Sequence, residues 1–356
     1  MRPSWLATVV LLSLACGTPS GEGNDLQPPV GPQLDSGLPP DSAPPLPPDD
    51  LGNLDFRPPL DGDAVLTGNA GGLGAGLPRL QVTMVDVGQG DGLLVKLPGG
   101  TVLAIDGGPS KGSYSAGLKT LGVRHIDYAV LSHAHADHYT GLTPAISALM
   151  PTDCLTRIFD PGMERNDVIG YPEFRTVAGC RYQKVAIGQT LNLDSAVEVS
   201  VLSAHDMRFG ATDDSHGINN TSVVVRLRYG RFSMLFEGDA EQQAEQATYQ
   251  AFPLLLRSTV LKAGHHGSCT ASGNTYLDQV APQFLLMSMS NGNTYGMPHC
   301  QTMVKLKARP QLRWARTDVN GNVTVATDGS LYAVTLSRGL DSVETCPRDC
   351  VTPLDF

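Results

Sequence analysis

The chain between residues 80 and 336 alternates short apolar runs with turn residues. Runs rich in β-branched residues and bounded by glycine, proline or aspartate predict strands, and the intervening stretches of mixed polarity predict helices. The expected strands are residues 81–87, 93–97, 102–105, 126–131, 196–202, 221–228, 231–236, 258–262, 283–288, 312–316 and 331–336. The expected helices are residues 114–121, 141–149, 240–250, 274–280 and 302–308. Because strands first follow one another and then alternate with helices, we expect an α/β (α+β) fold in which helices cover layers of sheet.

The N-terminal part of the chain has a different character. Arg2 followed by an apolar run over residues 5–15 is typical of an export signal, and the run is too short to span a bilayer. A small residue before Cys16 resembles the site at which bacterial lipoproteins are cleaved and lipidated. We expect residues 1–16 to be a signal peptide and residues 17–78, dense in Pro, Gly, Asp and Ser, to be a disordered linker. The expected product is an exported bacterial protein, lipid-anchored to a membrane facing the periplasm or the cell exterior; plain secretion and an uncleaved anchor are the alternatives.

The cysteines fit this setting. Once Cys16 is set aside, six cysteines remain, and an even number in an exported chain predicts disulfides. The expected folded domain covers residues 79–338, followed by a tail at 339–356. Neighbours along the sequence suggest three pairs, although six cysteines allow 15 pairings and free thiols are the alternative. These pairs are Cys154–Cys180, Cys269–Cys300 and, within the tail, Cys346–Cys350.

The net charge narrows the range of functions. It is -10 at pH 7, which argues against a broad basic surface that follows nucleic acid. A small local pocket for anions stays compatible with this charge. The cysteines show no Cys-x-x-Cys spacing, so we do not expect a cysteine-based zinc site.

The run His-Ala-His-Ala-Asp-His at 133–138 follows the expected strand at 126–131 directly. In extended backbone, side chains two residues apart point the same way, so His133 and His135 can share one metal. Asp137 and His138 follow in the next turn and can face a neighbouring metal. Imidazole and carboxylate groups suit zinc, iron or manganese. The run therefore predicts a metal site at the end of a buried strand.

One segment cannot supply two coordination spheres, so more distant ligands are required. Asp239 follows an expected strand and can bridge two cations, although an Asp here is also a common helix N-cap. His265 and His266 stand between glycines after the strand at 258–262, which lets the backbone approach a metal or a phosphate closely. Two adjacent side chains point apart, so only one of these histidines is expected to be a ligand. The other would contact the substrate or donate a proton.

Taken together, these segments resemble the metallo-β-lactamase superfamily, and within it the hydrolase domain of bacterial competence proteins of the ComEC type. The matching segments occur in the family's order over roughly residues 80–338. They are Asp86-Val-Gly-Gln-Gly-Asp91, Asp106-Gly-Gly, the run at 133–138, Asn219-Asn220-Thr221-Ser222, Glu237-Gly-Asp239, Gly264-His-His-Gly-Ser268 and Tyr295-Gly-Met-Pro-His299.

The resemblance implies a four-layer αββα sandwich of the metallo-β-lactamase type, with the metals at one edge. It implies His133 and His135 on the first metal and Asp137 and His138 on the second. Asp239 would bridge the metals, His265 would complete the second site, and Asp106 would orient the ligand loop from behind. His266 and His299 would then act on the substrate, with Asp137, and Asn219 and Asn220 would line the mouth.

The chain departs from the family pattern at two places. Many members have a further histidine ligand on the first metal, before the strand expected at 221–228, and only His205 and His216 are near that position here. Met297 stands where the related pattern often has histidine, although His299 remains and could bind a metal or a phosphate oxygen. The first metal is therefore expected to be held less completely than the second.

The implied activity is hydrolysis by a water molecule activated by two divalent metals, Zn²⁺ being favoured and Mn²⁺ the alternative. A phosphodiester, including nucleic acid, is the leading substrate class. A β-lactamase or a lactonase-type ester hydrolase is the first alternative, and a non-catalytic, ligand-binding surface lipoprotein is the second. The membrane is expected as a partner through an N-terminal lipid, and no protein partner is predicted.

Overall fold

The computed structural model describes residues 79–163, 170–205 and 215–350. The expected signal peptide and linker, residues 1–78, lie outside the described residues, so the structure does not bear on them. Within the described part of the chain, no helix has the length and apolar character that crossing a membrane requires.

The first sheet contains eight strands of the described chain and combines two kinds of pairing. Its order is β14 (Tyr332–Leu336), β13 (Val323–Thr327), β1 (Leu80–Met84), β2 (Leu93–Lys96), β3 (Val102–Ile105), β4 (Tyr128–Val130), β5 (Arg157–Asp160) and β6 (Tyr182–Lys184). The strands from β14 to β3 are antiparallel, whereas those from β3 to β6 are parallel. Ile105 pairs with Val130, so the segments that follow β3 and β4 leave the sheet side by side.

The second sheet repeats this division with six strands of the described chain. Its order is β12 (Arg313–Arg316), β11 (Phe284–Met287), β10 (Val260–Lys262), β9 (Phe232–Phe236), β8 (Val224–Tyr229) and β7 (Glu198–Ser203). The strands from β9 to β12 are parallel, and Phe236, Lys262 and Leu286 lie in register. The segments after β9, β10 and β11 therefore emerge at one edge, where ligands of parallel sheets commonly bind.

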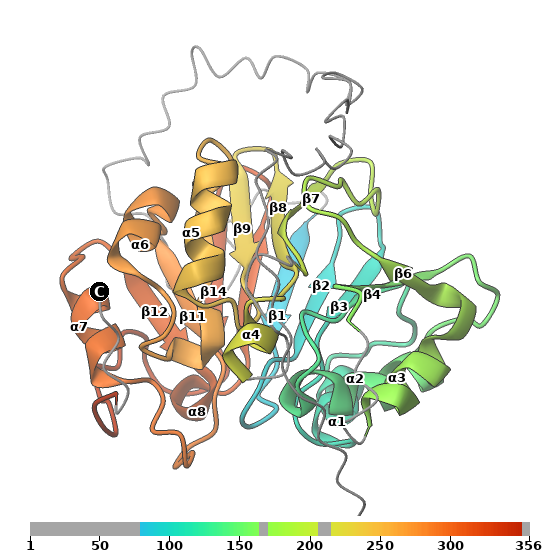
Figure 1. The fold of residues 1–356 in the computed structure, drawn as a ribbon, viewed down its shortest axis with the longest axis horizontal. Coiled ribbons are helices and arrows are strands. Elements are labelled where there is room, and N and C mark those ends of the chain that lie inside the picture. Colours follow the sequence, from blue (N-terminus) through green and yellow to red (C-terminus); the bar gives the residue numbers. More distant parts are fainter. Residues whose placement is uncertain (1–78, 164–169, 206–214, 351–356) are drawn as a thin grey trace, which may run out of the picture. The chain divides into compact units, whose positions relative to one another are not determined.

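Helices cover the outer face of each sheet (Figure 1). Three lie on the first sheet: α1 (Ser113–Thr120), α2 (Ala136–Leu149) and α3 (Tyr171–Ala178). Three lie on the second: α5 (Gln242–Ala251), α6 (Asn274–Val280) and α7 (Cys300–Lys307). Short turns of helix, α4 (Ser215–Asn219), α8 (Thr317–Asn320), η2 (Gly179–Arg181) and η4 (Gly264–Gly267), join these elements.

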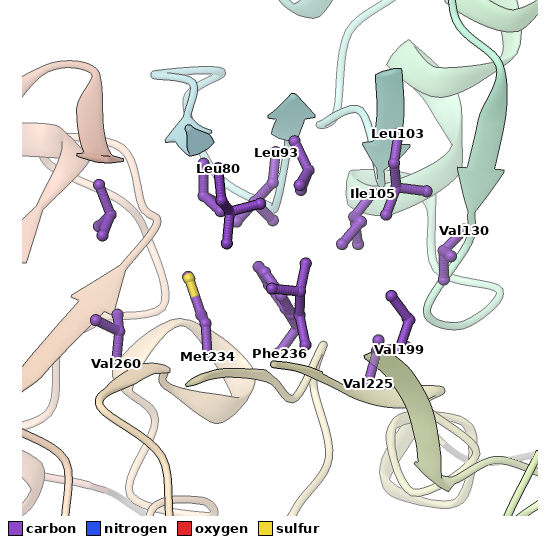
Figure 2. Packing of buried hydrophobic residues seen from close by; sticks show 14 of the residues in the cluster. Leu80, Leu93, Leu103, Ile105, Val130, Val199, Val225, Met234, Phe236 and Val260 are labelled. Carbon is purple, nitrogen blue, oxygen red and sulfur yellow. The ribbon is translucent and has the colours of Figure 1, made fainter. Parts of the chain in front are cut away.

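Three apolar clusters separate the layers. The largest lies between the two sheets, where Leu93 and Ile105 of the first face Val225 and Phe236 of the second (Figure 2). The other two lie between each sheet and its helices. The fold is therefore a mixed α/β sandwich of four layers, αββα, as expected.

Several elements differ from the sequence-based expectation. The helix expected to begin at Gly141 begins at Ala136, so Asp137 and His138 lie in its first turn rather than in a separate turn. A carboxylate there is favoured by the positive end of the helix dipole. Six elements of the structure were not predicted from the sequence: β5, β6, β13, α3, α4 and α8. Most of these are short, and tertiary pairing rather than local pattern decides such strands.

Three disulfides join the six cysteines in the described residues. Cys154–Cys180 is confirmed, but the other two expected pairs are wrong, because the bonds are Cys269–Cys350 and Cys300–Cys346. The reason is that the tail does not close on itself. It runs alongside α7, where the backbone N–H of Cys300 donates to the carbonyl of Arg348 at 3.1 Å.

Candidate metal centre

The first group of metal-binding side chains comprises His133, His135 and Asp239, whose ligand atoms lie within 4.8 Å of one another. Strand β4 ends at Val130, and the extended segment after it points both histidines the same way. Nε2 of His133 lies 3.0 Å from Nδ1 of His135. His133 is fully buried, while His135 is partly exposed.

The second group comprises Asp137, His138, Asp239 and His266, again within 4.8 Å. Asp137 and His138 come from the first turn of α2, Asp239 follows β9, and His266 lies in η4 after β10. The family resemblance implied His265 in this group, whereas the structure places His266 there. Both histidines have positive φ, 45° and 54°, and this unusual backbone turns His266 inward.

Asp239 lies between the two groups. Its Oδ2 atom is 3.2 Å from Nε2 of both His138 and His266, and 3.8 Å from Nε2 of His133. Among the described residues, Oδ1 of Asp239 and Nε2 of His138 and His266 have no hydrogen-bond partner. Burying such atoms is costly unless they bind something. This donor set of imidazole and carboxylate therefore fits two divalent cations that share Asp239.

The pKa shifts of the buried side chains also favour a metal-binding role. Burial lowers the pKa of His133, which keeps that ring neutral with a lone pair for a metal. Burial opposes charge on Asp239 and His266, yet the attraction between them prevails. It holds the pKa of Asp239 well below its ordinary value and raises that of His266 well above it. The buried carboxylate thus requires positive charge beside it, which a divalent cation supplies.

A buried carboxylate stands behind each histidine of the second group. Oδ2 of Asp106 lies 2.8 Å from Nδ1 of His138 and accepts a hydrogen bond from Oγ of Ser132 at 2.7 Å. This is the place expected for Asp106. A carboxylate in this position fixes the ring orientation and the tautomer of a histidine ligand.

Asp91 plays the corresponding part for His266, a role to which the sequence did not point. Its Oδ1 lies 3.3 Å from Nδ1 of His266, and its Oδ2 forms a buried ion pair with Lys262. Lys262 also donates to the carbonyl of Gly238 at 2.9 Å. The segment at 86–91 matched the family, but nothing in its pattern distinguished Asp86 from Asp91.

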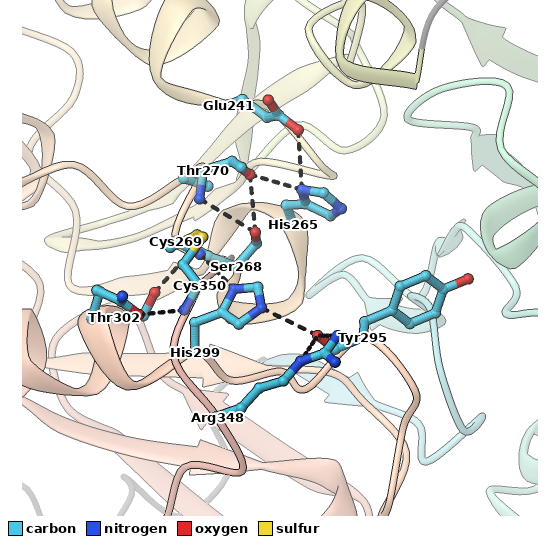
Figure 3. Close-up of a disulfide and its surroundings, with 12 residues drawn as sticks. Glu241, His265, Ser268, Cys269, Thr270, Tyr295, His299, Thr302, Arg348 and Cys350 are labelled. Atoms are coloured by element: carbon cyan, nitrogen blue, oxygen red, sulfur yellow. Dashed lines mark hydrogen bonds and ion pairs between the residues drawn. A yellow bond between two sulfur atoms is a disulfide. The ribbon is translucent and has the colours of Figure 1, made fainter. Parts of the chain in front are cut away.

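His265 lies beside the metal groups rather than within them. Its Nε2 is 4.0 Å from Oδ2 of Asp239, and its Nδ1 is 3.1 Å from the carboxylate of Glu241. Glu241 also accepts from Asn219 at 2.8 Å and lies 2.8 Å from Nδ1 of His216 (Figure 3 shows Glu241 and His265). Glu241 was missed by the sequence analysis, although it stands only two residues after Asp239.

The remaining expected residues lie elsewhere. Among the described residues, neither ligand group includes His205 or His216, the two candidates for the missing ligand of the first metal. Asn220 does not line the mouth: it is buried, and its Oδ1 accepts from the backbone N–H groups of Glu241 and Ala244 at the start of α5. It is therefore a helix cap.

His299 lies behind the loop that carries His266, and not at the metal groups. Its Nδ1 accepts from the backbone N–H of Cys269 at 3.0 Å, and its Nε2 lies 3.2 Å from the carbonyl of Tyr295 (Figure 3). His299, Cys269 and Cys350 are close enough to hold a metal, but both thiols are consumed by a disulfide. His299 therefore positions the two loops that carry Cys269 and Tyr295.

Comparison with known proteins finds relatives of this chain among competence proteins. ComE operon protein 3 of Bacillus subtilis (strain 168) is 29% identical over 262 residues, which cover 68% of this chain and 32% of that protein. Competence protein ComA of Neisseria gonorrhoeae is 29% identical over 249 residues, covering 67% of this chain and 31% of that protein. The chain therefore spans about a third of the length of these relatives.

Among solved structures, a diphosphatase from the PhnP family has a TM-score of 0.41 and 14% identity, and the match covers 70% of this chain and 99% of that one. Residues 85–287, more than half of the chain, match the Metallo-beta-lactamase superfamily. This range contains both ligand groups. The chain therefore belongs to the metallo-β-lactamase superfamily.

Proposed function

We propose that the protein is an exported, metal-dependent phosphodiesterase or nuclease. The observation that carries this proposal is the position of Asp239 between two ligand groups, at 3.2 Å from His138 and His266 and 3.8 Å from His133. Zn²⁺ is the metal that this donor set favours, with Mn²⁺ as the alternative. When bound, two such cations would lower the pKa of a water molecule and polarise a phosphoryl oxygen, which makes the phosphorus atom open to attack by that water.

The chain's own residues hold and orient the reacting groups. Asp137 projects from the first turn of α2 into the second group and is partly exposed, so it can also orient a water molecule. His265 is placed to contact the substrate, because Glu241 fixes its Nδ1 side and leaves Nε2 facing the site. In this proposal, Nε2 of His265 hydrogen-bonds a phosphoryl oxygen of the substrate.

The names of the relatives favour a phosphodiester over an amide or ester. One refers to competence, and that of a further relative, Recombination protein 2 of Haemophilus influenzae, refers to recombination, a process of DNA. Because the chain covers only about a third of these proteins, the activity of the whole relatives is not carried over. Residues 79–356 contain 23 Lys and Arg against 26 Asp and Glu, so a nucleic-acid substrate would be recognised by close contacts rather than by a wide basic surface.

The export part of the proposal is supported by the cysteines. Three disulfides in the described chain fit an oxidising compartment, such as the periplasm or the cell exterior. A lipid on Cys16 would then tether the protein to the membrane. Labelling with a fatty-acid probe in a bacterial host tests this directly: incorporation that a Cys16→Ser variant loses supports the anchor, and equal labelling of both rejects it.

One experiment tests the enzymatic proposal. Purified protein is assayed for bound metal and then for hydrolysis of bis-p-nitrophenyl phosphate, single-stranded DNA and nitrocefin. We expect bound or bindable divalent metal and turnover of the two phosphodiesters. Turnover of nitrocefin alone would favour a β-lactamase, and protein that binds no divalent metal would favour a non-catalytic ligand-binding role.

A further inference from the structure

The loop at 288–299 packs against segments that carry members of the second ligand group. On one side, Oγ of Ser288 donates to the carbonyl of Gly90 at 2.6 Å, and Gly90 packs directly against the backbone of Asp137. On the other side, the backbone N–H of His299 donates to the carbonyl of Gly267, the neighbour of His266, at 3.1 Å. The loop therefore touches the segments that present both Asp137 and His266.

The backbone of this loop is held by several hydrogen bonds. The side chain of Asn293 donates to the carbonyl of Met297 at 2.7 Å and accepts from its N–H at 2.9 Å, which closes the loop. The carbonyl of Tyr295 accepts from Nε of Arg348 at 3.0 Å and lies 3.2 Å from Nε2 of His299. The position of Tyr295 is thus fixed through its backbone and not through its ring.

Arg348 comes from the C-terminal tail, and two disulfides hold it there. Its neighbours Cys346 and Cys350 are bonded to Cys300 and Cys269, respectively. The guanidinium lies on Gly296, where a Cβ atom would come within 2.2 Å of Nε of Arg348. The tail therefore acts as a clamp on the Tyr295 loop, and it lies outside residues 85–287, the range that matches the family.

Within the described residues, the hydrogen bonds of Tyr295 in this arrangement involve its carbonyl and not its ring. Its side of the loop is open: Tyr295 is 57% exposed, and Figure 3 shows the ring pointing away from His299 and Arg348. An exposed aromatic ring on a fixed backbone offers contact area at a low entropy cost. Bases of single strands stack on such rings with little regard to sequence.

We propose that Tyr295 is a stacking platform for a base of a single-stranded nucleic-acid substrate, and that Arg348 is the positioning residue that holds it. Residues 79–356 contain 26 Asp and Glu against 23 Lys and Arg, so their long-range attraction for a polyanion is weak and a short-range stacking contact would add to binding. This inference rests on the proposed phosphodiesterase function, which it deepens by naming how the substrate is recognised.

The test compares two fluorescently labelled strands of about ten nucleotides, oligothymidylate and a strand of equal length made of abasic units. Both carry the same phosphodiesters, and only one carries bases. KM and kcat are measured for metal-loaded wild type, Tyr295→Ala, Tyr295→Phe and Arg348→Ala. Leu254→Ala, another strongly exposed apolar side chain, is the matched control.

We expect wild type to show a KM about tenfold lower for oligothymidylate than for the abasic strand. Tyr295→Ala should bring this ratio close to one, Tyr295→Phe should keep it, and Arg348→Ala should reduce it in part. Leu254→Ala should match wild type. If wild type hydrolyses bis-p-nitrophenyl phosphate but shows equal KM for both strands, or if Tyr295→Ala leaves the ratio intact, the inference fails while the proposed function stands. If no phosphodiester is hydrolysed, the proposed function fails, and the inference fails with it.

Discussion

The two ligand groups share Asp239 but differ in how their other members are supported. In the second group, His138 and His266 are fully buried, and Asp106 and Asp91 stand behind their Nδ1 atoms at 2.8 and 3.3 Å. In the first group, His133 and His135 contact Ser132, each other, Asp239 and the ring of His138, and no carboxylate of the described residues is bonded behind either ring.

This difference predicts different metal affinities. A carboxylate behind a histidine ligand fixes its orientation and strengthens it as a donor. The second group also has four members, whereas the first has three. We therefore expect the second site to hold its metal more tightly, and the first to lose it more readily to a chelator.

The largest effect is expected for Asp239→Ala, because this change removes a ligand from both groups at once. Hydrolysis should fall by at least about 1,000-fold, since the metal pair supplies several kcal/mol of transition-state stabilisation. Metal content measured by mass spectrometry should fall close to zero. A variant that retains two equivalents of metal would show that Asp239 does not bridge the groups.

Single-group variants come next and separate the two sites. Asp137→Ala should remove the second metal and abolish hydrolysis while leaving the fold, measured by circular dichroism, intact. His135→Ala should instead remove only the first metal and leave the second bound. Metal titration by calorimetry measures which site each variant retains. If both variants lose the same site, the two ligand groups do not form separate sites. Wild-type activity in Asp137→Ala would show that the ligand assignment is wrong.

The supporting carboxylates should have a smaller effect. Asp106→Asn and Asp91→Asn should each weaken the second metal by about 10- to 100-fold and leave the first unchanged. Asp160→Asn is a matched control, because Asp160 is also buried at the end of a parallel strand but binds Tyr171 and Tyr182 instead of a ligand histidine. Equal losses of metal affinity in all three variants would point to a general change of fold.

The smallest effect on the metals is expected for Asn220→Ala. Its side-chain oxygen satisfies two buried N–H groups at the start of α5, so its loss should cost about 1–2 kcal/mol of unfolding free energy. Chemical denaturation measures this cost, and metal titration should show both affinities close to those of wild type. A selective loss of one metal would instead connect α5 to that ligand group.

The layered fold could be predicted from the sequence because its strands are marked by β-branched runs and its order of elements is regular. The spacing at 133–138 likewise placed His133 with His135, since a strand repeats every two residues. Asp239 was recognisable because it follows a strand and precedes a helix. Short elements such as β6 and α8, in contrast, have too few residues for their pattern to stand out.

What the sequence determined by itself was therefore local: the ligand types, their spacing within each segment and the strand ends that carry them. What only the tertiary structure decided was which segments meet. The choice of His266 over His265 depends on two positive φ angles that no spacing rule specifies. The role of Asp91 depends on the loop between the antiparallel strands β1 and β2 meeting the segment after β10 of the other sheet, and the tail's clamp on Tyr295 depends on which cysteines pair. The physical reason is the same in each case: a side chain's chemistry is fixed by its type, but its partners are fixed by backbone paths that come together from far along the chain.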